Sequence, residues 1–344
     1  MRKKLIIYLF IIFSIAIYSS CINEMKFSED QQLGEIVVNC LLSPDSLVKA
    51  NITNSRFFLK PDSSFSVVRG LTIQLKVNNN FKENLKLKGS NYVSTYRIAS
   101  GDKITLIIKD PVKGKLLNAE TQVPQKVIIN HIDSLLEFPG SSFSIHDTIL
   151  SNGIKYTDTL GIALNSILNF TIHFVDAPDT INYYRISAIL RHTYVDNKQV
   201  DKKLVLYPND PAIERIDGAD IFDANSNRNF NIISDKLFDG KSYGLKIYSK
   251  MTYFKATPDK IKYPYANLPQ IPIKSEIIFD LQAISVDFFN YLKTVKYNNS
   301  DLQYFSEPVQ IYSNINNGTG ILGGVTHHYF KVKLNTEQLS FFYE

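Results

Sequence analysis

The segment from residue 35 to residue 123 contains six short apolar runs separated by turn residues, and this pattern constrains the fold most. The runs are rich in Val, Ile, Leu and Thr, and turn residues such as Ser43-Pro44-Asp45 and Gly101-Asp102 separate them. They cover residues 35–43, 47–53, 71–78, 92–96, 103–109 and 116–123. Strands this short and this closely spaced predict an immunoglobulin-like β-sandwich over residues 35–126.

The spacing of the apolar stretches changes after Pro124, and we place a domain boundary between residues 126 and 127. The apolar stretch 127–138 opens a larger β-rich domain that extends to residue 344. Residues 170–174 and 183–190 indicate paired strands, as do residues 243–248 and 274–281. Apolar residues in 281–297 recur mostly at helical spacing and predict one amphipathic helix. The fold class expected for the chain is therefore mainly β.

Residues 1–20 have the organisation of a bacterial lipoprotein signal peptide that ends just before Cys21. A basic start precedes an apolar run over residues 5–18, and Ser19 and Ser20 supply the small residues that a signal peptidase requires. Tyr18 departs from the Leu most often found three residues before the cysteine. We expect Cys21 to carry the lipid and residues 21–34 to form a flexible tether. A plain secretory signal and a short anchor helix are the alternatives.

Charge and cysteine content argue against a nucleic-acid-binding protein and against a fold stabilised by an intrachain disulfide. Removal of residues 1–20 takes away Arg2, Lys3 and Lys4, which lowers the formal charge from +5 to +2, and the remaining acids and bases are interspersed. This balance argues against a nucleic-acid partner. Once Cys21 is acylated, Cys40 has no partner for an intrachain disulfide. Because Cys40 lies in an apolar strand pattern, we expect it to be a buried hydrophobic residue.

Motifs that could carry chemistry are incomplete. Residues 240–244 match the G-x-S-x-G pattern around Ser242, but an Asp-Gly turn precedes them and an alternating, strand-like pattern follows. Residues 223–229 resemble the first half of a calcium loop, whose second half does not match. The adjacent His327 and His328 would point to opposite faces of a strand. We therefore expect no enzyme, no metal and no cofactor.

A glycine-rich and asparagine-rich stretch near residues 306–324 is the candidate recognition surface. Its glycines suit either tight turns or close approach by another backbone or a ligand. The candidate residues are Glu307, Pro308, Tyr312, Asn314, Asn316, Gly318, Gly320, Gly323 and Gly324.

Four stretches, residues 38–45, 174–186, 234–240 and 306–324, carry a resemblance to the DUF4249 family of uncharacterised Bacteroidetes lipoproteins. Departures are mild: Cys40 stands where a glycine is common, and Leu322 where an aromatic residue is expected. The resemblance implies an outer-membrane context and neighbouring genes for TonB-dependent transporters, and it implies no reaction. It also raises the possibility of O-glycosylation at Asp-Ser/Thr dipeptides, which are ordinary turn sequences as well.

We accordingly expect a non-enzymatic protein anchored to outer-membrane lipid through acylated Cys21 and facing the cell surface, with the periplasmic face as the alternative. Its expected role is that of an accessory or ligand-binding partner of a TonB-dependent transporter. An adhesive or glycan-binding surface lipoprotein is the alternative function. A hydrolase that uses Ser242 is a third hypothesis.

Overall fold

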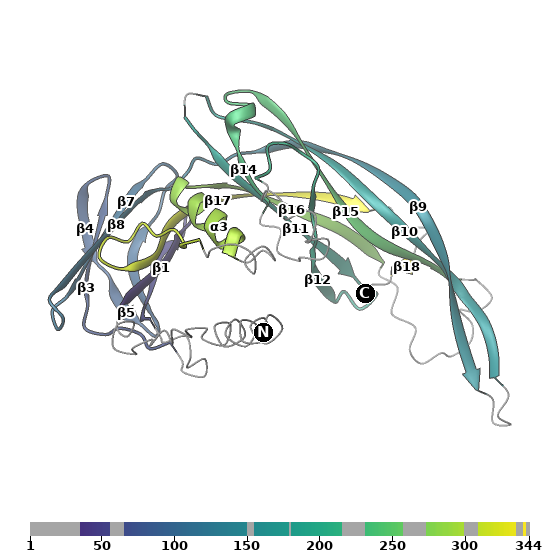
Figure 1. The fold of residues 1–344 in the computed structure, drawn as a ribbon, viewed down its shortest axis with the longest axis horizontal. Coiled ribbons are helices and arrows are strands. Elements are labelled where there is room, and N and C mark those ends of the chain that lie inside the picture. The colour runs from purple at the N-terminus through teal and green to yellow at the C-terminus, as the bar shows by residue number, and fades with distance from the viewer. Residues whose placement is uncertain are drawn as a thin grey trace, which may run out of the picture.

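The computed structural model describes residues 35–55, 65–149, 155–178, 180–214, 231–256, 273–298, 309–334 and 340–341. It is mainly β, as predicted, with several sheets and a single α-helix among the described residues. In Figure 1 the strands form an arch, with the helix on its concave side. No helix in these described ranges is long and apolar enough to cross a membrane.

The first part of the chain forms two sheets that share one core. One sheet contains β1 (Ile36–Leu42), β2 (Leu47–Asn54), β6 (Asn91–Arg97) and β5 (Lys86–Lys88). The other contains β4 (Asn80–Asn84), β3 (Thr72–Val77), β7 (Lys103–Asp110) and β8 (Lys115–Gln122). Alternate residues of β1, β2, β3, β7 and β8, together with Tyr92 of β6, are buried in a common apolar cluster, which holds the two sheets face to face. All six predicted strands are confirmed, while the immunoglobulin-like topology stays a prediction.

Within this first part of the chain, sequence reasoning missed two short strands. β4 and β5 are almost entirely exposed and are composed largely of Lys and Asn. Such residues produce no apolar alternation, so periodicity carries no signal for them.

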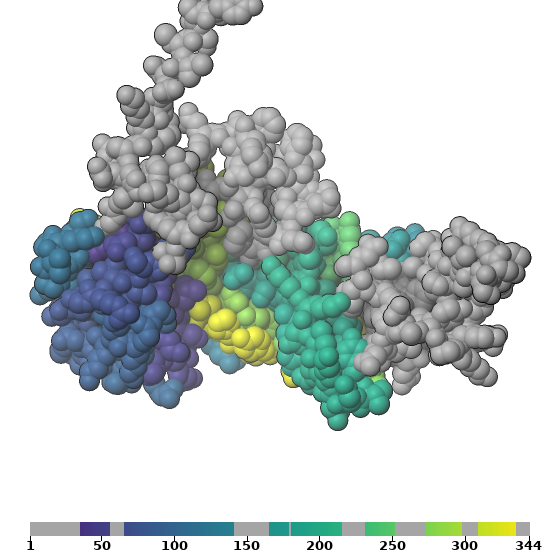
Figure 2. Space-filling model, turned by 90° about the horizontal axis from the view of Figure 1, so that it is seen from below, coloured from purple at the N-terminus to yellow at the C-terminus, as the bar shows by residue number. Residues whose placement is uncertain are grey.

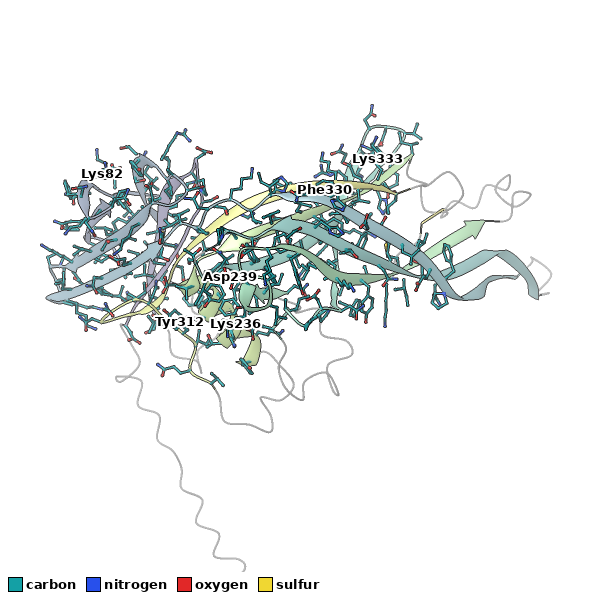
Figure 3. All side chains as sticks on the ribbon, turned by 90° about the horizontal axis from the view of Figure 1, so that it is seen from above. Lys82, Lys236, Asp239, Tyr312, Phe330 and Lys333 are labelled. Carbon is teal, nitrogen blue, oxygen red and sulfur yellow. The ribbon has the colours of Figure 1, made fainter. Side chains whose placement is uncertain are left out.

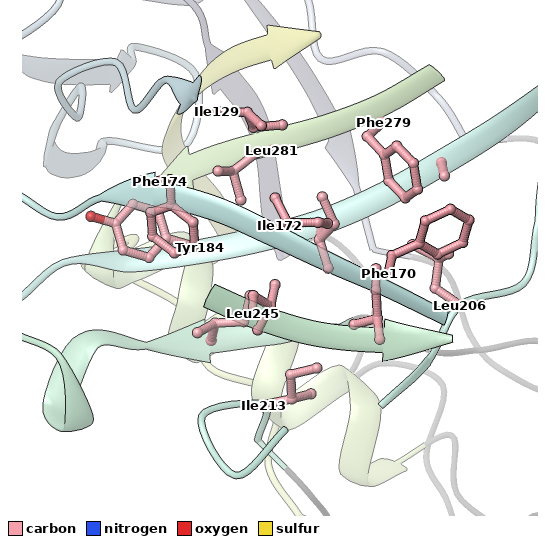
Figure 4. Packing of buried hydrophobic residues seen from close by; sticks show 14 of the residues in the cluster. Ile129, Phe170, Ile172, Phe174, Tyr184, Leu206, Ile213, Leu245, Phe279 and Leu281 are labelled. Atoms are coloured by element: carbon pink, nitrogen blue, oxygen red, sulfur yellow. The ribbon is translucent and has the colours of Figure 1, made fainter. Parts of the chain in front are cut away.

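The second part of the chain is a larger pair of sheets. One contains β13 (Tyr207–Pro208), β15 (Ser242–Ala256), β10 (Lys155–Val175) and β9 (Ile129–Ile149), with β18 (Ser340–Phe341) beside β15. The other is built from β12 (Gln199–Leu204), β11 (Tyr183–Thr193), β16 (Lys274–Ile284) and β17 (Thr319–Leu334), with β14 (Ile232–Ser234) beside β11. Figure 4 shows the core between them, where Phe170 meets Phe279 edge to face.

Neither predicted pair of strands forms, because residues 170–174 do not pair with residues 183–190, and residues 243–248 do not pair with residues 274–281. β10 pairs with β15 and β9, whereas β11 pairs with β16, β12 and β14. Both strands bury their alternate apolar side chains, so they face each other across the core, where Phe174 and Tyr184 lie with ring centroids 5.3 Å apart. The connection after β10 therefore crosses from one sheet to the other.

β17 joins the two parts of the molecule. Its first six residues, Thr319 to Gly324, pair in parallel with β1 of the first part. The following residues, from Val325 to Leu334, pair antiparallel with β16 of the second part. One sheet of nine strands therefore extends through both parts, and its order is β12-β11-β16-β17-β1-β2-β6-β5 with β14 beside β11.

The helix α3 spans Val286–Asn298, so the prediction of a helix from residue 281 began too early. Leu281 and Ile284 are the last residues of β16 and pair with both β11 and β17. Their apolar spacing suited either a helix or a strand. They form a strand because the backbone there pairs with a neighbouring strand on each edge. Ser285 then begins the helix, because its Oγ accepts a hydrogen bond from the Phe288 amide at 3.3 Å.

Candidate binding cleft

A cleft of about 970 Å³ lies between the first part of the chain, α3 and the residues that lead into β17. One wall is the outer face of β1 and β2, where the odd-numbered residues of β1 point away from the core. Figure 2 shows the purple first part of the chain meeting the yellow C-terminal segment on the lower face of the molecule. The lining residues are Glu35, Val37, Asn39, Asn51, Thr53, Phe65, Tyr291, Thr294, Gln310, Ile311, Tyr312, Ser313, Ile315, Gly318, Thr319 and Gly320.

The second wall is residues 309–324, which we call the linking segment. Tyr312, labelled in Figure 3, is held against α3 because its amide donates to Thr294 Oγ1 at 2.9 Å. The Tyr312 hydroxyl donates to Asp287 Oδ1 at 2.8 Å, and Thr121 Oγ1 of β8 donates to the other oxygen of Asp287 at 2.8 Å. Burial, followed by the bond to Asp287 and its charge, raises the pKa of Tyr312 to about 12. One carboxylate therefore ties the linking segment and α3 to the first part of the chain.

The glycines of the linking segment allow close approach between backbones. Gly320 has a φ of +110°, and a Cβ placed there would overlap the carbonyl oxygen of Val38 on β1. A Cβ at Gly323 would come within 2.9 Å of Phe288 on α3, and one at Gly324 within 2.9 Å of the Gln122 carbonyl oxygen. Gly318 is similarly confined by β1 and β8. These glycines let β17 fit between β1, α3 and β8.

The asparagines of the linking segment are bonded to neighbouring strands. The Asn314 side-chain amide donates to the Leu322 carbonyl at 2.8 Å and accepts from the Leu322 amide at 3.0 Å. Asn316 donates through its backbone amide to the Asn118 carbonyl at 2.9 Å and through Nδ2 to Asn118 Oδ1 at 2.7 Å. Both residues therefore fasten the linking segment to its own strand or to β8.

The predicted recognition residues thus occupy two environments. Tyr312, Gly318 and Gly320 border the cleft, whereas Asn314, Asn316, Gly323 and Gly324 hold the linking segment in place. Glu307, Pro308 and the lipid-attachment residue Cys21 lie outside the described residues.

The opposite wall of the cleft was not predicted. The alternation of β1 indicates that Val37 and Asn39 face away from the core, but local sequence carries no sign that residues 310–320 come to lie beside them. Phe65 is 58% exposed and had no strand or helix pattern to draw attention to it.

A family model described as a domain of unknown function, DUF4249, matches residues 22–329. The chain belongs to the DUF4249 family. No curated protein matches it. The match includes both halves of the molecule, so the cleft and the whole linking segment lie within the DUF4249 region.

Two of the stretches that carried the DUF4249 resemblance meet in one turn region. Asp176 Oδ2 accepts from the Gly240 amide at 2.8 Å, its Oδ1 accepts from the Tyr184 hydroxyl, and Asp235 Oδ2 accepts from the Asn182 amide at 2.5 Å. Asp176 and Asp235 are both buried, and burial raises the pKa of Asp235. Within this DUF4249 protein, residues 174–186 and 234–240 are therefore held together by hydrogen bonds to two buried carboxylates, which indicates a structural role.

Most of the other residues considered as functional candidates in the sequence lie in strands or in the core. Ser242 is exposed at the start of β15, which confirms the predicted strand after the turn. His327 bonds to Asp280, whereas His328 accepts from the Ile129 amide at 3.0 Å, so the two rings have different surroundings as expected. Cys40 is buried, which confirms its prediction as a core residue. The half calcium loop at 223–229 lies outside the described residues.

Proposed function

We propose that this DUF4249 protein is a lipid-anchored binding protein of the cell envelope that holds a ligand or partner segment in its cleft. The observation that carries the proposal is the cleft itself, because a concavity of about 970 Å³ is at the upper end of the range for small-molecule sites. The proposed context is the outer membrane, with an accessory role beside a TonB-dependent transporter. The transporter link is supported by the family resemblance alone.

The chemistry of the cleft suits an amphipathic ligand. Phe65 and Ile311 are 58% and 48% exposed and offer apolar surface that a ligand can cover. Asn39 and Gln310 line the same concavity with side-chain amides, a group that both donates and accepts hydrogen bonds. This combination of apolar contact and a few polar groups is typical of ligand sites.

The membrane anchor is proposed from Cys21. A Cys21→Ser variant should fold normally but be lost from the outer-membrane fraction, because the acyl chains that hold the protein in that bilayer are missing. Fractionation of cells and circular dichroism of the variant test this separately from the cleft. Retention of Cys21→Ser in the outer membrane would contradict the anchor.

The binding role is tested by purifying the full-length protein from outer membranes in mild detergent and identifying what accompanies it. The double variant Phe65→Ala/Ile311→Ala should lose most of a specific companion or ligand. Phe81→Ala is the matched control, since Phe81 is 57% exposed on β4 and is not a lining residue of the cleft. Equal recovery of the companion in all three proteins would exclude the cleft as its binding site.

An adhesive or glycan-binding role is the second candidate. Phe65, Tyr291 and Tyr312 border the cleft, and aromatic rings at a polar concavity can stack on sugar rings. A glycan array probed with wild type and Phe65→Ala distinguishes the two roles. Binding that depends on Phe65, without a transporter in the membrane preparation, would favour the glycan-binding role.

A further inference from the structure

Two histidines and an aspartate converge on the outer face of the sheet that contains β9 and β10. His173 Nε2 lies 2.9 Å from Asp133 Oδ2, and His131 Nε2 lies 3.9 Å from the same oxygen. The two imidazole rings are stacked with centroids 4.0 Å apart. One possible ligand atom from each of the three side chains lies within 4.8 Å of the others.

Strand register explains this convergence. His131 and Asp133 are two residues apart on β9, so both side chains point to the same face of the sheet. His173 is the residue of β10 directly opposite His131, and the next inward pair, Ile132 and Ile172, is packed in or against the core. The backbone hydrogen-bonded ladder therefore holds the three outward groups together.

The next strand leaves room for the central imidazole. Gly244 on β15 is the register partner of His173, and a Cβ at Gly244 would come within 3.2 Å of the imidazole Cε1. Glycine at that position therefore keeps this side of the His173 ring clear of a side chain from β15.

The spacing suits a small divalent cation. Zinc is bound at roughly 2.0–2.1 Å by histidine nitrogen and at about 2.0–2.2 Å by carboxylate oxygen, so tetrahedral ligand atoms lie about 3.3 Å apart. The separations from Asp133, 2.9 and 3.9 Å, lie on either side of that value. Because the two rings are stacked with an interplanar angle of 10°, their planes share no point near the ligand atoms, so both side chains must turn until the two lone pairs converge on the ion. The side chains of His131 and His173 are 60% and 28% exposed, which leaves them space to do so.

We infer that His131, Asp133 and His173 form a binding site for a divalent transition-metal ion of the zinc class. Two imidazoles and one carboxylate are a ligand set that zinc, cobalt, nickel and copper accept. Three protein ligands leave a fourth tetrahedral position, which faces solvent and can take water or a donor group from a partner. Because the ligands come from two adjacent strands, the ion would also fasten β9 to β10.

The test uses the full-length protein in detergent, purified without a polyhistidine tag and treated with EDTA. Zinc is then added in a calorimetric titration, and cobalt is used in parallel because its tetrahedral complexes absorb visible light. Wild type should bind one ion at this site. His173→Ala removes one of the three ligand atoms, and Asp133→Asn replaces the anionic carboxylate with a neutral amide. Each should weaken binding by about tenfold or more, at least as much as the loss of a second-shell partner of a metal ligand.

His327→Ala is the matched control. His327 also pairs with a carboxylate, with Nδ1 3.0 Å from Asp280 Oδ2, but neither group belongs to a three-residue cluster in the part of the chain that the structure describes. This variant should bind zinc like wild type. Circular dichroism checks that all variants are folded. Wild-type protein that binds no zinc, or His173→Ala protein that binds it with unchanged affinity, would overturn the site.

Discussion

Replacement of Gly320 by alanine should destabilise the protein through the junction between β1 and β17. Gly320 has a φ of +110°, a conformation that side-chain-bearing residues rarely adopt. The added Cβ would also overlap the Val38 carbonyl, which is a backbone atom within the parallel ladder and has no rotamer that relieves the contact.

The expected magnitude has two parts. Backbone strain at such a position costs about 1–3 kcal/mol, and forcing extra volume into a packed site costs about 1–3 kcal/mol. Gly320→Ala should therefore lower the free energy of unfolding by about 2–6 kcal/mol.

Two further glycines separate these contributions. Gly89 has a φ of +62° with no atom within 4 Å of an added Cβ, so Gly89→Ala should show strain alone, about 1–2 kcal/mol. Gly140 has neither a positive φ nor a neighbour, so Gly140→Ala should change stability by less than about 1 kcal/mol.

Urea unfolding followed by circular dichroism and tyrosine fluorescence measures the series, since the chain has 20 Tyr and no Trp. The expected order of midpoints is Gly140→Ala highest, then Gly89→Ala, then Gly320→Ala. If Gly320→Ala and Gly89→Ala unfold at the same urea concentration, close approach of β1 is not the reason for glycine at residue 320.

Three other outcomes are expected. Ser285→Ala should lower the free energy of unfolding measured in urea by about 1–2 kcal/mol, because the Ser285 Oγ of the wild type accepts hydrogen bonds from the amides of both Phe288 and Gly324. Burial raises the pKa of Cys40 to about 12, so iodoacetamide at pH 8 should label it only after unfolding, as mass spectrometry of its peptide can show. Cys40 and Tyr312 both have raised pKa values in the folded state, so their contribution to stability is complete below about pH 8.5 and is lost as the pH rises toward 12. Unfolding curves between pH 8 and pH 11 measure this fall, which should be smaller in Tyr312→Phe; an unchanged midpoint at alkaline pH would contradict it.

Sequence reasoning recovered the elements with strong local periodicity. The period-two alternation of β1 marks Ile36 and Cys40 as core residues, and both are buried. It failed where the apolar periodicity was weak, and where the spacing of apolar residues fitted both a strand and a helix. β4 has almost no buried residue, and Leu281 fits both the end of a strand and the start of a helix.

At the candidate sites, too, local sequence identified single residues, whereas strand pairing decided which residues come together. The glycines near residue 320 suited either a tight turn or a close approach, and only the parallel pairing of β17 with β1 shows that the Val38 backbone approaches Gly320. His131 and Asp133 share a face of one strand, whereas His173 joins them only through the register of β10.

The sequence by itself determined that the chain is mainly β, which residues of its regular strands are buried, and that Cys40 belongs to the core. Tertiary structure alone decided which strands pair, where the cleft forms and which histidines meet. The physical reason is that alternation reports the face of a strand that is buried, whereas the partner along each edge is selected by packing between residues far apart in the chain. Val38 and Gly320 are such a pair.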